Sequence, residues 1–350
     1  MPEIPAGMRA VRFNAADRKL KLTEVPVPEL EPHEVLVKVR ACGICLSDVH
    51  LIDGGIPPVK DEVTLGHEAS GDIVAMGSEV PGWEPGQYVV MAGGKPCGKC
   101  DRCKVGLLDD CRNFMLLGFH YDGAWADYVA VPYYACAPVP DSIPAEQAAI
   151  LADAVATPYA ALVERAGLKP SESVGLWGIG GLGTHAVQIA RMVGAGLVVA
   201  VDPLPSARER ALTVGADVAL DPTSQDVRGE ISKLTGGMML DVAVDLVGAN
   251  AVISQCVSCL GRGGRAVMVG LSLEPLQLEP SLLFGIQSHG VLGHLGYNKR
   301  HLEQLVRLLA GGRLDLESSI SDIMPLEDTP KGVERLASKD GDPVRLIVKP

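Results

Sequence analysis

Apolar and polar residues alternate in short segments through the first part of the chain. Residues 8–13 and 34–40 show the alternation most clearly, as expected for strands that bury one face. Similar segments continue through residues 63–90, where glycines such as Gly77 and Gly86 mark turns. Further strand-like segments lead up to Val139, so this part of the sequence predicts a compact β-rich domain.

The pattern changes after Pro144. Residues 145–166 are rich in alanine and predict a helix, with Pro144 in its first turn. From residue 171 onward, helical segments alternate with six apolar segments that we predict to be strands: 174–177, 197–201, 218–220, 242–246, 266–269 and 290–293. This alternation is typical of a parallel, doubly wound sheet. A helix at 301–310 and a strand at 344–348 follow, and both can return to the first domain.

Composition limits the possible classes of protein. At 350 residues the chain is long enough for two domains, and 47% hydrophobic residues argue against disorder. The net charge of −12 disfavours nucleic acid and anionic membranes as partners, because both require a basic surface. No apolar run approaches the length of a membrane span, and residues 1–12 lack a secretory signal. We therefore expect a cytoplasmic protein whose nine cysteines are metal ligands or buried thiols rather than disulfides.

Four cysteines stand close together in the glycine-rich segment 93–111. They follow the pattern C-x2-C-x2-C-x7-C and are Cys97, Cys100, Cys103 and Cys111. Four thiolates on one short loop can surround a zinc ion and leave no open position, which is typical of a structural site. An iron–sulfur cluster with the same ligands is the main alternative. Scattered free cysteines are a weaker alternative, because the spacing is so regular.

A second group of ionisable residues occupies Cys45-Leu-Ser-Asp-Val-His50 and Gly66-His-Glu68. We interpret Cys45 and His67 as ligands of a catalytic zinc, an ion that typically has three protein ligands and one open position. Ser47 and His50 would then carry a proton away from an oxygen bound there. The residues alone leave two alternatives open. Cys42 and Cys45 form a C-x-x-C that also occurs in redox pairs, and His67 is also compatible with a core histidine.

A glycine-rich turn follows the strand predicted at 174–177 and opens a helix predicted at 182–193. Its residues are Gly178, Gly180, Gly181, Leu182 and Gly183. Such a turn lets the backbone approach a pyrophosphate that faces the helix N-terminus. Asp202 ends the next strand, roughly 20 residues later, where a carboxylate accepts hydrogen bonds from the adenosine ribose and repels a 2′-phosphate. The sequence therefore favours NAD over NADP. Arg208 stands nearby, but is more simply interpreted as a solvated charge on a helix face.

With these motifs in this order, the sequence resembles the zinc-dependent medium-chain alcohol dehydrogenases over nearly its whole length. Residues 43–50, residues 66–68, the cysteine segment and the glycine turn carry the resemblance. It implies an α/β protein in which a GroES-like, β-rich catalytic domain, residues 1–154 and 295–350, is interrupted by a doubly wound Rossmann domain that binds NAD, residues 155–294. It also implies two zinc ions (Zn2+) per chain, one structural and one catalytic.

The resemblance also supplies a third ligand of the catalytic zinc. The family position that usually holds a cysteine falls on Asp153, and a carboxylate oxygen is an acceptable zinc ligand. The resemblance further implies that Asp48 orients His67 and that Glu68 is a neighbouring group able to exchange onto the metal. Thr157 matches the family residue that backs the nicotinamide, one helical turn beyond Asp153.

The activity implied by the resemblance is the NAD-dependent interconversion of a secondary or bulky primary alcohol with its ketone or aldehyde, by hydride transfer. Zinc acidifies the substrate hydroxyl, and its proton leaves through Ser47, the cofactor ribose and His50. The implied assembly is a homotetramer, with a dimer as the alternative. Family positions around a largely apolar substrate site fall on Leu46, Phe119, Trp125 and Leu295.

Three alternatives remain in competition. One is an NAD-dependent polyol or cyclic hydroxyacyl-CoA dehydrogenase with the same metal chemistry. Another is a metal-free NADPH reductase of the same superfamily, which would lack the cysteine segment and the pair Cys45 and His67, so a zinc assay separates it. The third is a non-catalytic zinc- and nucleotide-binding protein. The intact ligands and the hydroxyl of Ser47 argue against this last alternative.

Overall fold

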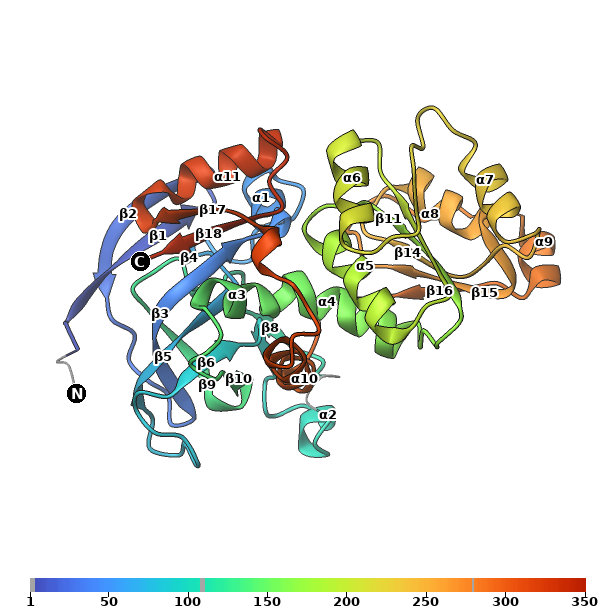
Figure 1. Cartoon of the computed structure of the whole chain (residues 1–350). Helices are drawn as coiled ribbons and strands as arrows, with labels where there is room; N and C mark the ends of the chain where they lie inside the picture. Colours follow the sequence, from blue (N-terminus) through green and yellow to red (C-terminus); the bar gives the residue numbers. More distant parts are fainter. Residues whose placement is uncertain (1–3, 108–110, 279) are drawn as a thin grey trace. The chain divides into compact units, whose positions relative to one another are not determined.

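The structure, a computed structural model, describes residues 4–107, 111–278 and 280–350. The chain divides into two units (Figure 1). The first unit comprises Met1–Ala156 and Tyr297–Pro350, and the second comprises Thr157–Gly296. The fold class predicted from the sequence, a β-rich domain interrupted by an α/β domain, is confirmed.

The first unit is built on mainly antiparallel sheets, with one parallel pair of strands at the edge of the larger sheet. The larger one has the order β10 (Cys136–Pro138), β6 (Tyr88–Met91), β5 (Glu68–Met76), β3 (Glu34–Ile44), β18 (Arg345–Lys349) and β17 (Ile320–Pro325), and β9 (Tyr128–Pro132) also pairs with β3. A smaller sheet has the order β2 (Lys19–Pro26), β1 (Gly7–Asn14) and β4 (Glu62–Thr64), and a short ribbon joins β7 (Gly94–Lys95) to β8 (Met115–Leu116). The strand predicted at 344–348 is β18, and it pairs antiparallel with β3, so that Val348 lies opposite Cys42.

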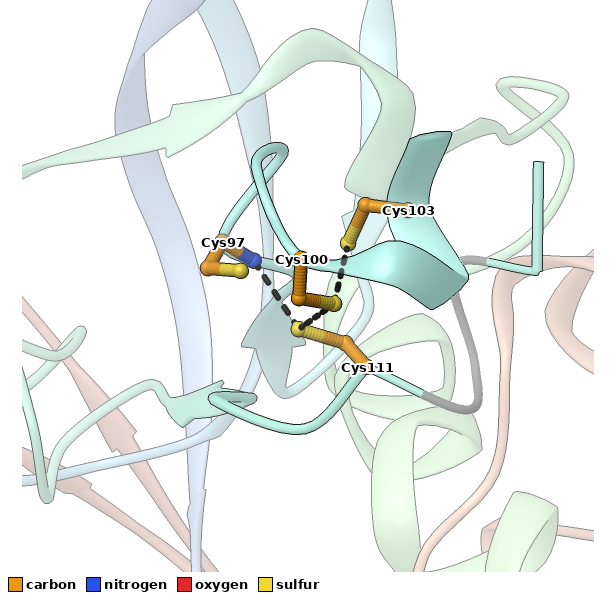
Figure 2. Close-up of side chains that lie close together, drawn as sticks. All are labelled: Cys97, Cys100, Cys103 and Cys111. Carbon is orange, nitrogen blue, oxygen red and sulfur yellow. Dashed lines mark hydrogen bonds between the residues drawn. The ribbon is translucent and has the colours of Figure 1, made fainter. Parts of the chain in front are cut away.

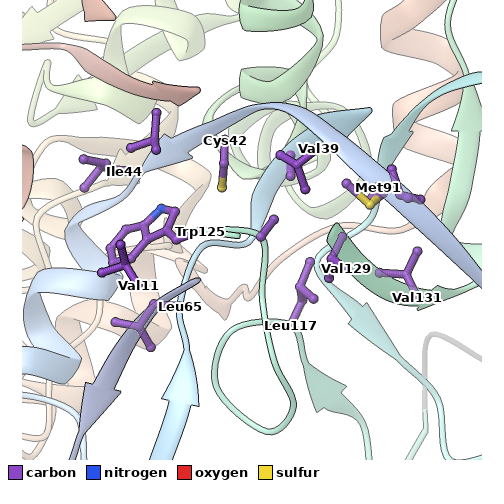
Figure 3. Close-up of a cluster of buried hydrophobic side chains, with 14 of the residues drawn as sticks. Val11, Val39, Cys42, Ile44, Leu65, Met91, Leu117, Trp125, Val129 and Val131 are labelled. Atoms are coloured by element: carbon purple, nitrogen blue, oxygen red, sulfur yellow. The ribbon is translucent and has the colours of Figure 1, made fainter. Parts of the chain in front are cut away.

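Aliphatic side chains from these strands form the core of the first unit (Figure 3). Trp125 is fully buried there, and its indole N–H donates to the carbonyl of Gly43 at 3.3 Å. A buried side chain of this size contributes several kcal/mol, and truncation to alanine typically costs about 3–5 kcal/mol. This core gives a rigid base to β3 and β5, the two strands whose ends carry Cys45 and Glu68.

The second unit contains a six-stranded parallel sheet. Its order is β13 (Val218–Leu220), β12 (Leu197–Val201), β11 (Ser173–Trp177), β14 (Leu240–Asp245), β15 (Leu260–Met268) and β16 (Gly290–Gly293). All six strands were predicted from short apolar runs, and their boundaries differ from prediction mainly at the start of β15. The helices that alternate with them are α5 (Gly181–Val193), α6 (Pro205–Thr213), α7 (Val227–Leu234), α8 (Asn250–Ser258) and α9 (Ser281–Gln287). The chain order reverses at β11, next to which such sheets bind nucleotides.

The continuous helix predicted at 145–166 is wrong. Helix α3 (Ala145–Ile150) ends before Ala152, which is extended with ψ 125°, and Asp153 has φ 65° and ψ −67°. Helical structure resumes with α4 (Ala156–Tyr159). Pro144 lies at the N-cap with ψ 146°, just outside the first turn. The alanine content predicts helix correctly on average, but it carries no information about a break that tertiary contacts impose.

The remaining helices belong to the first unit: α1 (Leu46–Asp53), α2 (Asp101–Lys104), α10 (Lys299–Ala310) and α11 (Thr329–Ser338). Helix α10 begins two residues earlier than predicted, because Asn298 caps it by accepting a hydrogen bond from the His301 N–H. It packs against β10 and the stretch Leu151–Val155. Within the described residues, none of the helices has both the length and the apolar character that crossing a bilayer requires.

Candidate active site

Helix α1 begins where strand β3 ends, and Cys45 is its N-cap residue. Asp48 lies in the first turn, and its Oδ2 accepts a hydrogen bond from the Cys45 N–H at 2.9 Å. Its other oxygen, Oδ1, lies 3.3 Å from His67 Nδ1. Asp48 is fully buried, so one carboxylate fixes both the backbone of Cys45 and the ring of His67. This geometry is compatible with the orienting role that the resemblance implies for Asp48.

The position of His67 depends on the glycine before it. Gly66 has φ +90°, and a Cβ there would lie 2.5 Å from Trp125 Cδ1. No other residue fits without moving the buried indole. His67 itself is mostly buried, and its ring lies against Phe119 with 5.5 Å between the ring centroids. The backbone and the core together point His67 Nε2 toward Cys45 and Asp153.

Three predicted ligands converge in the first unit. Asp153 Oδ2 lies 3.3 Å from Cys45 Sγ and 3.4 Å from His67 Nε2. With a Glu68 oxygen included, the four candidate ligand atoms all lie within 4.8 Å of one another. Tetrahedral zinc with bonds of about 2.0–2.3 Å separates its ligand atoms by roughly 3.3–3.8 Å. The sulfur, nitrogen and oxygen donors therefore fit one zinc ion in both kind and spacing.

The backbone of Asp153 is strained. Its φ of 65° and ψ of −67° correspond to a tight turn that residues other than glycine rarely adopt. Such a conformation costs about 1–3 kcal/mol and persists only where the surroundings enforce it. Strain of this kind often occurs at ligand sites, and here it turns the carboxylate toward Cys45 and His67. Thr157 lies buried in α4, and the chain between it and Asp153 is not one regular helical turn as predicted.

Glu68 and Arg345 form a buried ion pair at the edge of this cluster. Glu68 Oε1 lies 3.3 Å from Arg345 Nη1, and both residues are almost inaccessible to solvent. Burial raises the pKa of Glu68 to about 8, although the Arg345 guanidinium opposes this shift. The lack of a side chain at Gly43 leaves room for the Glu68 carboxylate, since a Cβ there would lie 2.2 Å from Glu68 Oε2. The sequence analysis missed Arg345; the signal was a charged residue within the apolar strand Arg345–Lys349.

Ser47 and His50 lie on helix α1, three residues apart and therefore on one face. Ser47 Oγ lies 3.2 Å from His67 Nε2, beside the ligand cluster. The side chain of His50 is 45% exposed, and its Nδ1 lies 3.8 Å from Asp53 Oδ2. One residue is thus placed at the cluster and the other at the solvent, as a proton path requires.

Cys42 does not take part in this cluster. Its side chain is fully buried in the core of the first unit (Figure 3). Burial raises the pKa of Cys42 well above that of a free thiol, and the charge of Asp48 adds to the shift. A thiol in this environment is a poor nucleophile, so the alternative of a Cys42–Cys45 redox pair is not supported.

The four cysteines of segment 93–111, which we call the cysteine lobe, face one another (Figure 2). Cys100 Sγ lies 3.5 Å from Cys103 Sγ and 3.9 Å from Cys111 Sγ, and the Cys97 N–H donates to Cys111 Sγ at 3.1 Å. All four sulfurs lie within 4.8 Å of one another. A single tetrahedral ion with Zn–S bonds of about 2.3 Å needs sulfur separations of roughly 3.8 Å. An iron–sulfur cluster, with several irons between the thiolates, needs more room, so the geometry favours zinc.

Backbone hydrogen bonds prepare this lobe to hold a cation. The N–H groups of Cys103 and Arg112 lower the pKa of Cys100 to about 6, whereas loss of hydration raises the pKa of Cys103 to about 12. A divalent cation would allow all four to be thiolates. Residues 108–110 of the lobe lie outside the described part of the chain.

The glycine turn of the second unit fits a dinucleotide. Gly178 has φ +89°, and a Cβ on Gly183 would lie 2.0 Å from the Gly178 carbonyl oxygen, so helix α5 can pack closely only with glycine there. A Cβ on Gly180 would meet nothing within 4 Å. The open side of the turn at Gly180 therefore leaves room for a pyrophosphate, next to the helix that begins with Gly181 and Leu182.

Asp202 is buried at the end of β12. Its Oδ2 accepts the Ile179 N–H at 2.7 Å and its Oδ1 accepts the Leu204 N–H at 2.8 Å, so it ties the glycine turn to the next loop. Each carboxylate oxygen has a second lone pair that a ribose hydroxyl can still use. Arg208 is not a solvated helix charge as expected, because its Nη1 donates to the Asp202 and Pro203 carbonyls and its Nη2 lies 3.4 Å from Asp221 Oδ2.

The residues expected around the substrate differ in exposure. Leu46 is 42% exposed and Phe119 lies beside His67. Trp125 is a correction to the prediction, because at 0% exposure it belongs to the core and not to an accessible pocket. Leu295 is exposed and belongs to the second unit.

Comparison with known proteins agrees with this geometry. Residues 31–141 match the family "Alcohol dehydrogenase GroES-like domain" and residues 181–311 match "Zinc-binding dehydrogenase". An NAD-dependent alcohol dehydrogenase of Sulfurisphaera tokodaii is 33% identical over 94% of this chain and 96% of its own length. Sorbitol dehydrogenase of Bacillus subtilis is 30% identical over 99% of this chain and 98% of its own length.

A solved structure extends the likeness to three dimensions. A zinc-binding dehydrogenase of Sinorhizobium meliloti 1021, crystallised with NADP, superposes with a TM-score of 0.90, at 30% identity and covering 99% of this chain and 100% of that one. Full-length sequence relatives, two matching domain families and a shared fold lead to one conclusion. The chain belongs to the zinc-dependent medium-chain alcohol dehydrogenase family.

Proposed function

We propose that the protein is an NAD-dependent, zinc-dependent alcohol dehydrogenase, which interconverts a secondary or bulky primary alcohol with its ketone or aldehyde. The observation that carries the proposal is the convergence of Cys45 Sγ, His67 Nε2 and Asp153 Oδ2 on one point. Three such ligands can hold an ion and leave a position open for substrate, which is typical of catalytic zinc. A metal-free reductase does not require a thiol, an imidazole and a carboxylate that converge in this way.

The side chains of the first unit have distinct proposed roles. Cys45, His67 and Asp153 hold zinc, which when bound supplies Lewis acidity toward the substrate hydroxyl. Asp48 fixes the His67 ring through Nδ1, so that Nε2 faces the ligand cluster. Ser47 accepts the proton that leaves the substrate, and the exposed His50 delivers it to solvent.

The proposed cofactor is NAD, which supplies the hydride acceptor, with Thr157 behind the nicotinamide. The open side of the glycine turn at Gly180 supports a bound pyrophosphate. The buried carboxylate of Asp202 disfavours a 2′-phosphate, and Arg208 is already engaged by two carbonyls and Asp221. One solved structure similar to this chain contains NADP, so the preference for NAD is tested by comparing kcat/KM for NAD and NADP.

Two zinc ions per chain are proposed, because two separate groups of ligands each fit a tetrahedral ion. Cys97, Cys100, Cys103 and Cys111 would hold the structural one. The alternative substrate class is a polyol, and the similarity to a sorbitol dehydrogenase favours it. A cyclic hydroxyacyl-CoA stays a further alternative with the same metal chemistry.

A homo-oligomer, tetrameric or dimeric, is also proposed. Apolar side chains that are at least 45% exposed gather in the second unit at Leu271, Leu273, Leu276, Leu282, Leu283 and Ile286. In the described part of that unit, strand β16 pairs with β15 on one side only. An exposed strand edge beside apolar side chains is a suitable surface for a second copy. A cytoplasmic location is consistent with nine free cysteines.

Metal analysis combined with a substrate panel tests the function. Purified protein should contain two equivalents of zinc and reduce NAD in the presence of primary, secondary or cyclic alcohols, with kcat/KM higher for NAD than for NADP. Cys45→Ala should retain one equivalent of zinc and lose the activity. Two retained equivalents in Cys45→Ala, or no turnover by the zinc-loaded wild type with any alcohol, would contradict the proposal.

A further inference from the structure

Tyr297 precedes helix α10 in the first unit and has no place in the ligand set or the proton path. Its hydroxyl oxygen accepts a hydrogen bond from the Gly93 N–H at 3.0 Å. Gly93 lies close to a predicted ligand, since a Cβ on Gly93 would lie 3.3 Å from the Tyr297 hydroxyl oxygen and 3.7 Å from the His67 carbonyl oxygen. The Tyr297 hydroxyl therefore contacts the backbone next to the group of candidate metal ligands.

The position of Tyr297 is fixed from two sides. The next residue, Asn298, caps α10, and its backbone N–H donates to His301 Nδ1 at 3.2 Å. Helix α10 packs against the stretch Leu151–Val155, which carries Asp153. With the backbone held by a capped helix and the hydroxyl held by Gly93, the ring has little freedom to move. Such rigidity is what positioning a ligand requires.

The hydrogen of the Tyr297 hydroxyl is available to a ligand. Within the described residues, no protein atom accepts it, although a phenol can donate and accept at once. Burial raises the pKa of Tyr297, and the charge of Asp153 raises it further, so the group keeps its proton at neutral pH. Tyr297 is partly buried, and a hydroxyl donor in such a site that has no protein acceptor within the described residues is an expected place for a substrate oxygen.

The surrounding charges indicate what kind of oxygen fits. Asp48, Glu68 and Asp153 all lie in this cluster, while the guanidinium of Arg345 already faces Glu68 and the ring of His67, neutral as a metal ligand, is held by Asp48. Bound zinc would be balanced by the thiolate of Cys45 and the carboxylate of Asp153. Among the described residues of this cluster, a substrate carboxylate would meet no unpaired side-chain cation, whereas a hydroxyl or carbonyl oxygen needs only a hydrogen-bond donor.

We propose that Tyr297 determines substrate specificity by donating a hydrogen bond to a second, uncharged oxygen close to the reacting carbinol, so that the preferred substrates are vicinal diols and related hydroxy ketones. The inference rests on the proposed dehydrogenase function and narrows its substrate class. Tyr297 holds the second oxygen while the metal ligands define the position of the first. Two fixed points orient the carbinol carbon more strictly than one.

The test compares 2,3-butanediol with 2-butanol, which share a carbon skeleton and differ in the second hydroxyl. Wild-type protein, loaded with zinc and supplied with NAD, should give the higher kcat/KM with the diol. Tyr297→Phe keeps the ring and removes the donor, so the ratio of the two kcat/KM values should fall about tenfold or more. Tyr121→Phe is the matched control, because this buried hydroxyl of the same unit has no hydrogen-bond partner in the part of the chain that the structure describes. It should change the ratio less than about twofold.

A binding measurement separates recognition from a structural effect. The enzyme–NADH complex is titrated with 2,3-butanediol and followed by NADH fluorescence, and Tyr297→Phe should raise Kd about tenfold while its zinc content stays that of the wild type. An equal loss of kcat/KM with both alcohols would overturn the inference and leave the dehydrogenase intact. The third compound in the comparison is 2-hydroxybutanoate, which carries a carboxylate next to the carbinol. A wild-type preference for 2-butanol or for 2-hydroxybutanoate over 2,3-butanediol would overturn the inference as well. Turnover of none of the three by wild type would overturn the inference, and only failure with the whole panel of alcohols would remove the proposed function as well.

Discussion

Ser47 offers a test of the proton path that leaves the metal ligands in place. Its Oγ lies 3.2 Å from His67 Nε2, but Ser47 is not one of the four residues whose ligand atoms converge. Ser47→Ala should lower kcat by about 10²–10⁴-fold, the usual contribution of a positioned proton acceptor. Zinc content should stay at the wild-type value, as measured by metal analysis of the purified variant.

The control for this change keeps the hydroxyl. Ser47→Thr should retain most of the activity, because the oxygen is still available one bond from the same carbon. Activity of Ser47→Ala close to that of wild type would remove Ser47 from the path. Loss of zinc in Ser47→Ala would instead show that the hydroxyl supports the ligand cluster.

The pair Glu68 and Arg345 makes a second prediction at the scale of single residues. At pH 9, where Glu68 with its pKa of about 8 is ionised in the wild type, Arg345→Met should lower the free energy of unfolding by about 3 kcal/mol, because it removes the counter-charge of a buried carboxylate. The double variant Arg345→Met with Glu68→Gln should recover much of this loss, since no uncompensated charge remains. Urea unfolding of the zinc-loaded proteins measures both values, and equal stability of the single and double variants would contradict the account.

The sequence predicted much of this site, and the exceptions have a physical reason. Cys45, His67 and Asp153 were proposed as ligands, and the structure brings their Sγ, Nε2 and Oδ2 atoms together. Arg345 and Tyr297 could not be predicted in the same way. Each reaches the cluster through long-range packing, by pairing of β18 with β3 and by return of the chain into helix α10. Local patterns of residues carry no signal for such contacts.

At the scale of elements, the parallel strands of the second unit were predictable because each contains a short apolar run between turn residues, and in β11, β12 and β14 this run is almost completely buried. The break between α3 and α4 was not. Alanine-rich sequence favours a helix by local propensity, and the strained turn at Asp153 is imposed by what surrounds it. The backbone thus departs from its local helical preference at Asp153, a proposed metal ligand. There the placement of the carboxylate outweighs the cost of the strained backbone conformation.

The glycine turn before α5 gives a prediction in which two similar changes have different results. Gly183→Ala should destabilise the second unit, because its Cβ would lie 2.0 Å from the Gly178 carbonyl oxygen. Gly180→Ala should leave the fold intact, since its Cβ meets nothing within 4 Å. It should nevertheless weaken NAD binding about tenfold, as the methyl group would occupy the space that a pyrophosphate needs.

Thermal unfolding and NAD titration of the two variants separate these effects. The expected result is a lower Tm for Gly183→Ala and an unchanged Tm with a higher Kd for Gly180→Ala. NAD affinity of Gly180→Ala equal to that of wild type would show that the pyrophosphate does not approach this position.

At the scale of the whole molecule, the first unit couples its stability to alkaline pH through buried thiols away from the metal sites. Cys136 is fully buried on β10, and burial raises its pKa to about 12 from an ordinary value of 9.0. Below pH 9 the thiol is protonated in both the folded and the unfolded chain. Between about pH 9 and 12 only the unfolded chain ionises, so the folded state binds more protons and its stability falls as pH rises.

Cys136→Ala isolates this contribution. At pH 8 the variant should be less stable than wild type because truncation leaves a cavity. By pH 10 the difference between the two should shrink by about 1.4 kcal/mol, since only the wild type loses the stability linked to Cys136. Urea unfolding at both pH values measures the change. Val131→Ala, another buried truncation on β9, the preceding strand along the chain, has no titrating group and should show the same deficit at pH 8 and pH 10. A constant deficit in Cys136→Ala as well would mean that its thiol ionises equally in the folded and unfolded chains.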